Sequence, residues 1–252
     1  GRAVCEQLLA EGERVRALTH AHSKSAARFT PLPPAAEVVS GSVLEPDSLA
    51  PLFAHAEGES VTLIHAAAVV SVDERDERCR RVNVDGTKNV IDACRRYGVK
   101  KLLYVSSVDA LPPRPEGETV REPLAYDPAS LTGAYARSKA EASRLIAEAA
   151  KAGLCAELVL PSCILGPGDH GGGFTSVLIR AYLICYPRLS VGGGYDFVDV
   201  RDVAAAVAAA ARRVALHREQ RRHLLRRHRA EPADHPLLAI AQAEGGDRRL
   251  GA

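Results

Sequence analysis

Tyr135 and Lys139 are the residues whose types and spacing point most clearly to chemistry. They stand four positions apart in the segment 133–150, with neither glycine nor proline between them. A helix would therefore place both side chains on one face, about one turn apart. An ammonium beside a phenol lowers the phenol pKa from its reference value of about 10, which prepares the phenol to donate a proton near neutral pH.

Two serines, Ser106 and Ser107, follow the apolar run 101–105 earlier in the chain. If that run is a strand, both hydroxyls lie at its carboxyl end. The chemistry that this combination indicates is protonation of a carbonyl oxygen while a hydride reaches its carbon, with a serine hydroxyl holding the oxygen. Tyr97 and Lys101 have the same spacing, but Gly98 stands between them. We expect it to end the helix, so this second pair need not share a face.

The elements that must position these residues alternate along the chain. Strand candidates cover 14–19, 61–65, 101–106 and 156–160, and helical patterns cover 2–11, 74–97 with a break, and 133–152. Gly98 and Gly153 fall between a helical pattern and a strand, where a left-handed residue is needed. The alternation predicts an α/β fold with a doubly wound parallel sheet, which binds ligands outside the carboxyl ends of its strands.

Composition excludes several classes of protein. The chain has 252 residues, of which 46% are hydrophobic and 25% charged, as in ordinary globular proteins. With no apolar run of bilayer length and no signal-like start, we expect a cytoplasmic protein and no membrane partner. The six cysteines show no C-x-x-C spacing, so we expect buried thiols and no metal site. Residues 211–230 hold eight Arg and one Glu without an aromatic residue, which favours a solvated segment over a nucleic-acid partner.

Seven segments in chain order resemble one family. They are 65–68, 83–90, 104–107, Tyr135 with Lys139, 160–162, 166–169 and 196–204. Together they are similar to the extended short-chain dehydrogenase/reductases, and most similar to dihydroflavonol-reductase-like members of the NAD-dependent epimerase/dehydratase group. The resemblance runs from Gly1 to about residue 210. It implies a Rossmann domain, expected over 1–160, and a partial substrate lobe over 161–252 that includes the basic segment 211–230.

The resemblance also implies a nicotinamide cofactor, a small-molecule substrate and a catalytic set. In that set Tyr135 is the acid/base, Lys139 lowers its pKa and binds the ribose, and Ser107 polarises the substrate oxygen. Ser107 is preferred over Ser106 because it is the last of the pair. The implied cofactor-binding positions are Gly1, His20, Ser42, Val43, Ala66, Ala67, Ala68, Asn83, Tyr135, Lys139, Pro161, Ser162, Cys163 and Ile164. A homodimer is compatible with the resemblance.

The chain departs from the family pattern at three places. The glycine-rich phosphate loop is absent, and Gly1 stands where its last glycine would fall. We therefore expect a sheet without its first strand, two neighbouring strands with unpaired edges, and weakened cofactor binding. His20, His22 and Lys24 follow the strand 14–19 without a carboxylate, which favours NADP over NAD. From about residue 212 the resemblance fails. The Arg/His-rich sequence there is typical of a GC-rich gene that is read out of frame.

The leading hypothesis is an NAD(P)-dependent oxidoreductase that moves a hydride between nicotinamide and a secondary alcohol or ketone. A sugar-nucleotide epimerase or dehydratase would use the same three residues and stays open as an alternative. A non-catalytic dinucleotide-binding protein and an inactive fragment stay open as well. Near the end of the resemblance, Asp202 is expected to cap a helix that begins at Val203.

Overall fold

The computed structural model describes residues 1–20, 32–55, 57, 59–115, 118, 120, 121, 123, 125–169, 174–185, 194, 196–213 and 237–241. The strands are β1 (Val15–Thr19), β2 (Glu37–Ser40), β3 (Val61–His65), β4 (Lys101–Val105), β5 (Ala156–Val159), β6 (Cys163–Leu165), β7 (Phe197–Asp199) and β8 (Leu237–Ala241). The helices are α1 (Arg2–Ala10), α2 (Glu77–Arg80), α3 (Gly86–Arg96), α4 (Ala134–Lys151), α5 (Phe174–Cys185) and α6 (Val200–Arg212). Short helical turns are η2 (Pro46–Phe53), the π-helical η3 (Arg81–Asp85), η4 (Val108–Ala110) and η5 (Pro128–Ser130).

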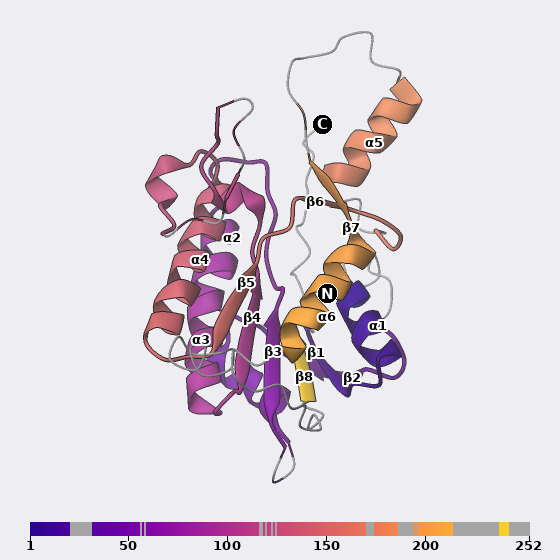
Figure 1. Ribbon diagram of the computed structural model, residues 1–252, viewed down its shortest axis with the longest axis vertical. Coiled ribbons are helices and arrows are strands. Elements are labelled where there is room, and N and C mark those ends of the chain that lie inside the picture. Colours follow the sequence, from indigo (N-terminus) through magenta and orange to yellow (C-terminus); the bar gives the residue numbers. More distant parts are fainter. Residues whose placement is uncertain are drawn as a thin grey trace, which may run out of the picture.

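A parallel sheet with helices on both faces forms the body of the protein (Figure 1). Its six strands lie in the order β2-β1-β8-β3-β4-β5, and β6 and β7 form a separate parallel pair. Helices α3 and α4 cover one face, while α1 and α6 cover the other. The predicted α/β class with a parallel sheet is confirmed.

The central strands are apolar along their whole length because both of their faces are covered. Leu63, Leu102 and Tyr104 pack with the helices α3 and α4. Ile64 and Leu103, which alternate with them, pack with α1 and α6. All five side chains are 1% exposed or less. Successive side chains of a strand point to opposite faces, so these two strands contribute to both cores.

Two glycines end the helices that precede β4 and β5. Gly98 has φ +63° and Gly153 has φ +99°, a left-handed conformation that costs a residue with a Cβ free energy. Each follows the last turn of its helix, α3 or α4, as the sequence predicted. The turn at Gly98 also separates Tyr97 from Lys101, the other tyrosine and lysine that stand four residues apart. Tyr97 stacks on Phe53, while Lys101 begins β4.

The centre of the sheet, which we expected to lack a strand, is occupied by β8. Leu18 of β1 is in register with Ala241, and Ile64 of β3 is in register with Ile240. The expectation of two unpaired edges is therefore wrong. A short apolar run from the far end of the sequence meets the backbone hydrogen-bonding requirement of both neighbours.

Helix α6 packs beneath the sheet, so elements on both sides of the predicted boundary at residue 160 share one core. Val203, Val207 and Ala208 belong to the same buried cluster as Val4 and Leu8 of α1. The helix begins after Asp199, whose carboxylate accepts a hydrogen bond from the backbone N–H of Arg201 at 2.7 Å. The prediction of Asp202 as the cap is wrong, because the helix starts three residues earlier.

Lys101 holds the other end of α6 against the sheet. Its buried Nζ donates to the carbonyl oxygens of Ala210 at 2.5 Å and Arg213 at 2.8 Å. It also lies 3.1 Å from Glu157 Oε2 on β5. Backbone carbonyls at a helix C-terminus lack partners within the helix, and a cation there satisfies them.

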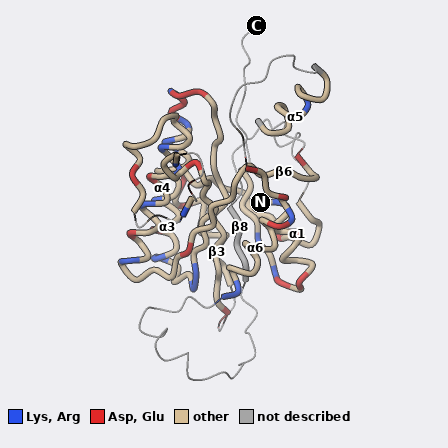
Figure 2. Tube along the Cα trace, turned by 45° about the horizontal axis from the view of Figure 1, so that its top comes forward, with Lys and Arg blue, Asp and Glu red and all other residues tan. Residues whose placement is uncertain are grey.

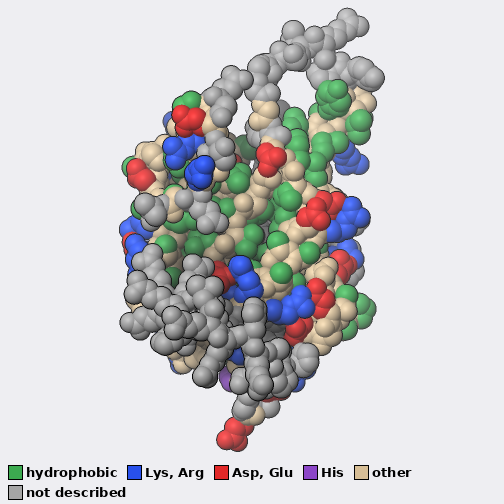
Figure 3. Space-filling view, viewed as in Figure 1, with side chains coloured by type: hydrophobic (Ala, Val, Ile, Leu, Met, Phe, Trp, Pro, Cys, Tyr) green, Lys and Arg blue, Asp and Glu red, His purple; other side chains and the backbone are tan. Residues whose placement is uncertain are grey.

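The surface of the described chain is mixed in charge, with one apolar helix. Figure 2 shows Lys and Arg interspersed with Asp and Glu on the described helices, and most of the basic segment 211–230 lies outside the described residues. Figure 3 shows hydrophobic side chains along α5, and its exposed apolar residues are Val177, Leu178, Tyr182, Leu183 and Ile184. Among the described helices, none has both the length and the apolar character that a bilayer crossing requires.

Candidate active site at the carboxyl edge of the sheet

The residues predicted to do chemistry meet where β4 ends and α4 begins. Ser106 and Ser107 directly follow β4, and Tyr135 and Lys139 lie in the first two turns of α4. The α4 backbone has no break between this pair, so the spacing of four places both on one side of the helix. The Ser107 side chain lies beside the Tyr135 phenol. The fold thus brings two hydroxyls from distant segments together at one edge of the sheet.

The two adjacent serines have different environments. Ser106 Oγ lies 2.6 Å from Ser143 Oγ, and both hydroxyls are buried between β4 and α4. Ser107 Oγ donates to Asp109 Oδ2 at 3.2 Å and accepts from the Asp109 N–H at 3.2 Å.

The pKa of Tyr135 shifts in the direction opposite to the one expected from the sequence. Burial raises the pKa, the neighbouring Ser107 hydroxyl offsets part of the rise, and the Asp109 charge adds to it. The nearby ammonium, on which the expectation depended, donates instead to Tyr104. The phenol therefore stays protonated at neutral pH, which is the form that a proton donor needs.

Lys139 is buried beside the strand β4, with 3% of the residue exposed. Its Nζ donates to the Tyr104 hydroxyl at 3.2 Å and to the Val105 carbonyl at 2.7 Å, and lies 4.7 Å from the centroid of the Tyr104 ring. Burial lowers the pKa of Lys139 to about 7. An ammonium has three hydrogens, and these contacts use two of them.

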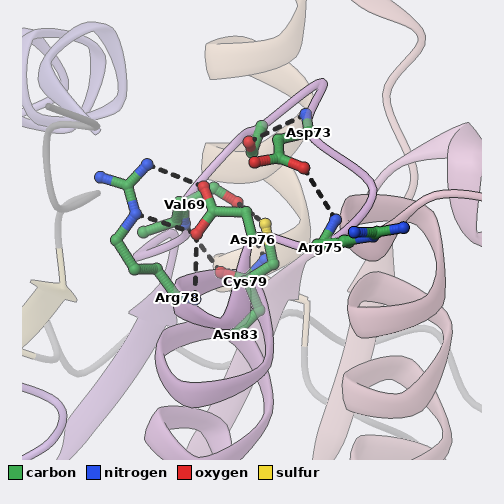
Figure 4. Close-up of polar contacts among 8 residues, drawn as sticks. Val69, Asp73, Arg75, Asp76, Arg78, Cys79 and Asn83 are labelled. Carbon is green, nitrogen blue, oxygen red and sulfur yellow. Dashed lines mark hydrogen bonds and ion pairs between the residues drawn. The ribbon is translucent and has the colours of Figure 1, made fainter. Parts of the chain in front are cut away.

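Asn83 ties the loop after β3 to helix α4. Its Oδ1 accepts from the Val69 N–H at 2.7 Å, and its Nδ2 donates to Val69 O and to Ser138 Oγ, both at 2.9 Å. Figure 4 shows Asn83 and Val69 facing each other, with Cys79 beside them. Both amide hydrogens are used in these bonds. In this structure the Asn83 side chain holds the loop, and its contact with the cofactor stays a prediction.

The residues predicted to lie near the adenosine differ in burial and in packing. Ala67 and Ala68 are buried after β3, at 1% and 8% exposed, and Ala66 is partly exposed. Val43 is buried at 2% and packs so closely on α3 that a Cβ on Gly86 would lie 2.7 Å from its Cγ2. The Val43 side chain therefore serves the core, and the contact of this residue with adenine stays a prediction. The neighbouring Ser42 is also buried, and its hydroxyl accepts from the Leu44 N–H at 3.2 Å.

The remaining predicted positions follow the strands β5 and β1. The Val108 N–H donates to Pro161 O at 3.1 Å, which joins the segment 161–164 to the turn after Ser107. Within that segment, Ser162 is partly buried, Cys163 begins β6 and Ile164 is 38% exposed. His20 directly follows β1, whereas His22 and Lys24 lie outside the described residues.

The arrangement fits a nicotinamide dinucleotide. From β1 the chain moves outward to β2, and from β3 it moves outward to β4 in the opposite direction, so the sheet has a topological switch point beside β8. Dinucleotides bind outside the carboxyl ends of strands at such a point. Helix α1 follows Gly1, and its first turn holds no acidic residue and no side-chain cap. Its N–H groups can therefore take an anionic phosphate.

Comparison with known proteins agrees with this geometry. A family model described as the NAD dependent epimerase/dehydratase family matches residues 1–222. The chain belongs to this family. The resemblance inferred from the sequence motifs is thereby confirmed, and the family indicates a nicotinamide dinucleotide cofactor.

Individual relatives match a large share of the chain. A Synechocystis sp. protein named dihydroflavonol 4-reductase is 32% identical over 206 residues, which cover 81% of this chain and 58% of the relative. Sterol demethylase protein B of Methylococcus capsulatus is also 32% identical over 206 residues, with 81% and 60% covered. The crystal structure of gox2253 is 28% identical with a TM-score of 0.74, covering 98% of this chain and 67% of that one. The chain thus spans about three-fifths of the length of these two curated relatives.

Two contacts of the residues predicted to be catalytic were not predicted from the sequence. Asp109 accepts the hydrogen of Ser107, and Tyr104 accepts from Lys139. Strand alternation could have indicated Tyr104, since it shares a face with Ser106 two residues later. The spacing of Ser107 and Asp109 is typical of a serine that caps a short turn, as observed for η4.

Proposed function

We propose that the protein is an NAD(P)-dependent oxidoreductase that moves a hydride between the nicotinamide and a secondary alcohol or ketone. The observation that carries this proposal is the placement of Ser107 beside the buried Tyr135 phenol at the carboxyl edge of the sheet. Lys139 lies one turn further along the same helix. Two adjacent hydroxyls, one of them an acid kept protonated by burial, suit the binding and protonation of one carbonyl oxygen.

The chain supplies the proton and the orientation in this reaction. A bound nicotinamide dinucleotide supplies or accepts the hydride. In the reductive direction, the carbonyl carbon receives the hydride and Tyr135 gives its proton to the carbonyl oxygen, so that the ketone becomes a secondary alcohol. Ser107 rotates its hydroxyl from Asp109 to hold that oxygen, and the third ammonium hydrogen of Lys139 is available to a ribose hydroxyl. The reverse direction moves the same proton back to Tyr135.

The region after β6 favours an apolar ketone over a sugar nucleotide as the substrate. Helix α5 exposes large apolar side chains, with Tyr182 at 67%, Leu183 at 68% and Ile184 at 79% (Figure 3). Its sequence contains a single charged residue, Arg180. A nucleoside diphosphate requires charged or strongly polar partners, whereas an apolar ring gains free energy by covering exposed apolar surface.

The test is NAD(P)H oxidation, followed by absorbance, with a panel of cyclic and aromatic ketones. We expect turnover by the wild type, and a decrease in kcat of about 10²- to 10⁴-fold in Tyr135→Phe with cofactor affinity nearly unchanged. Tyr97→Phe removes the same hydroxyl from a tyrosine outside the site and should keep its rate. An unchanged kcat in Tyr135→Phe would exclude the mechanism. Conversion of a sugar nucleotide without net NAD(P)H oxidation would instead support an epimerase.

We further propose that NADP is preferred over NAD. His20 follows β1 at the position where a carboxylate would select the ribose hydroxyls of NAD. Calorimetric titration with both cofactors decides the matter. Tighter binding of NADPH, lost in His20→Asp, is the expected result, and equal dissociation constants would contradict the preference.

A further inference from the structure

A buried hydrogen-bonded cluster adjoins the catalytic helix and ends on Lys139. It consists of His65 at the end of β3, Thr87 in α3 and Tyr104 in β4, each 0% exposed. None of these three side chains reaches the surface, and none takes part in the proton transfer proposed above. Polar groups buried to this degree cost free energy unless they are bonded to each other, so the directions of their bonds can be worked out.

Thr87 fixes the first direction. Its Oγ1 lies 2.6 Å from the backbone carbonyl of Asn83. A carbonyl only accepts, so the Thr87 hydroxyl hydrogen is used in this bond. Every other partner of Thr87 Oγ1 must therefore donate to it.

His65 fixes the second direction. Its Nε2 lies 2.9 Å from Thr87 Oγ1 and must be the protonated nitrogen, because the threonine hydrogen is already used. Burial, together with the Lys139 charge, lowers the pKa of His65 to about 3, so the ring is neutral and carries one hydrogen. Its Nδ1 is then a bare acceptor, in agreement with the lack of a partner for this atom among the described residues.

Tyr104 completes the chain of bonds. Its hydroxyl lies beside Thr87; since Thr87 has no hydrogen left to give, Tyr104 is the partner that can donate in a bond between them. The lone pairs of the Tyr104 oxygen are thereby free to accept, and Lys139 Nζ lies 3.2 Å away. The His65 ring packs against the Tyr104 ring with centroids 5.2 Å apart, which limits movement of the phenol.

We propose that Tyr104 is a positioning residue for Lys139, and that Thr87 and His65 orient its hydroxyl so that the oxygen accepts from the ammonium. Together with the Val105 carbonyl, the Tyr104 oxygen holds two of the three ammonium hydrogens. The third ammonium hydrogen remains available to a ligand in the site. The proposal rests on the proposed function for its catalytic consequence, but not for its structural content.

The charge of Lys139 should depend on this cluster. The titratable groups that face Lys139 are Tyr104 from β4, His65 from β3 and Tyr135 from its own helix. His65 is neutral near pH 7, and burial keeps both tyrosines protonated. Burial favours the neutral amine, so the Tyr104 oxygen and the Val105 carbonyl are the contacts that stabilise the ammonium.

The first test measures the titration of Lys139 by NMR in protein labelled with ¹⁵N-lysine. The chain contains six lysines, and Lys139→Met assigns the resonance. Tyr104→Phe should lower the pKa of Lys139 by about 1 to 2, the size expected for one lost hydrogen bond to a charged group. Tyr97→Phe, the matched control, should leave it unchanged. An unchanged titration in folded Tyr104→Phe would overturn the proposal.

The second test uses Thr87, in case Tyr104→Phe does not fold. Thr87→Val keeps the shape of the side chain but removes the oxygen that orients Tyr104, so the pKa of Lys139 should fall. Thr87→Ser restores the hydroxyl and should restore the pKa. If both Thr87 variants titrate like the wild type, the orientation of Tyr104 does not depend on Thr87 and the proposal fails.

The pH profile of kcat connects the cluster to catalysis. If Lys139 acts as an ammonium, its deprotonation produces the basic limb of the profile. This limb should move to lower pH in Tyr104→Phe and Thr87→Val, with a larger loss of rate at pH 8 than at pH 6. A uniform loss across pH would contradict positioning through Lys139. Absence of turnover in the wild type would defeat the proposed function alone, because the NMR titration needs no substrate.

Discussion

Ser106 and Ser143 allow a quantitative test of how the structure divides two neighbouring serines. Ser106→Ala leaves the Ser143 hydroxyl, which is 0% exposed, without its partner at 2.6 Å. A buried hydroxyl without a partner costs about 1 to 3 kcal/mol. Ser143→Ala has the same cost, reduced by about 0.5 kcal/mol because alanine is the better helix former. The double variant leaves no hydroxyl unpaired, so we expect the two effects to be non-additive by about 1 to 2 kcal/mol.

Urea denaturation followed by circular dichroism measures all four proteins of this cycle. The m-value should be the same in each, which shows that differences in midpoint report stability. A coupling free energy near zero would show that the two hydroxyls do not stabilise one another and would refute the assignment of Ser106 to the core. Ser107, the next residue, allows the corresponding test of function. Ser107→Ala should lower kcat by about 10²- to 10³-fold with little change in stability, whereas Ser106→Ala should keep kcat.

Three further predictions concern stability. Lys101→Met should lower the free energy of unfolding by about 3 to 5 kcal/mol, measured in urea, since it leaves the carbonyl end of α6 without its buried cation and removes one of the two cations that contact Glu157; a loss below 1 kcal/mol would contradict this. Burial lowers the pKa of His65 to about 3 from 6.5, so the unfolded chain binds a proton that the folded chain does not, and stability falls as pH decreases through this window. His65→Asn should reduce that dependence by up to about 1.4 kcal/mol per pH unit, measured by denaturation at several pH values, and an unchanged slope would argue against a neutral buried imidazole. Deleting 237–252 should abolish cooperative thermal unfolding, whereas deleting 242–252 keeps β8 and should preserve it; equal melting curves would show that β8 does not complete the sheet.

The parts that depend on local pattern could be predicted from the sequence. The apolar runs that became β3 and β4 are covered on both faces, and such strands have a continuous rather than alternating pattern. Gly98 and Gly153 marked the helix ends because few other residues adopt a positive φ there. The meeting of Ser107 with Tyr135 followed from one rule, that parallel strands and the helices after them share a carboxyl edge.

The parts that depend on tertiary contacts could not be predicted in the same way. Spacing placed Lys139 near Tyr135, but the acceptor of its ammonium is Tyr104, on a strand that lies elsewhere in the sequence. The sign of the Tyr135 pKa shift depends on burial, which a spacing between two residues does not reveal. The pairing partners of β8 lie more than 170 residues earlier in the chain. A short apolar run does not indicate which strands it will pair with.

The position of β8 also determines the order in which this chain can complete its sheet during synthesis. Strands β1 and β3 leave the ribosome long before the strand that lies between them, since Val61 pairs with Leu237. At about 5 to 20 residues per second, the nascent protein waits on the order of 10 to 30 s before that strand exists. Through this interval two parallel edges are open to other chains. Yield in cells should therefore respond to translation speed and to chaperones that shield strand edges, even in variants whose finished fold is as stable as the wild type.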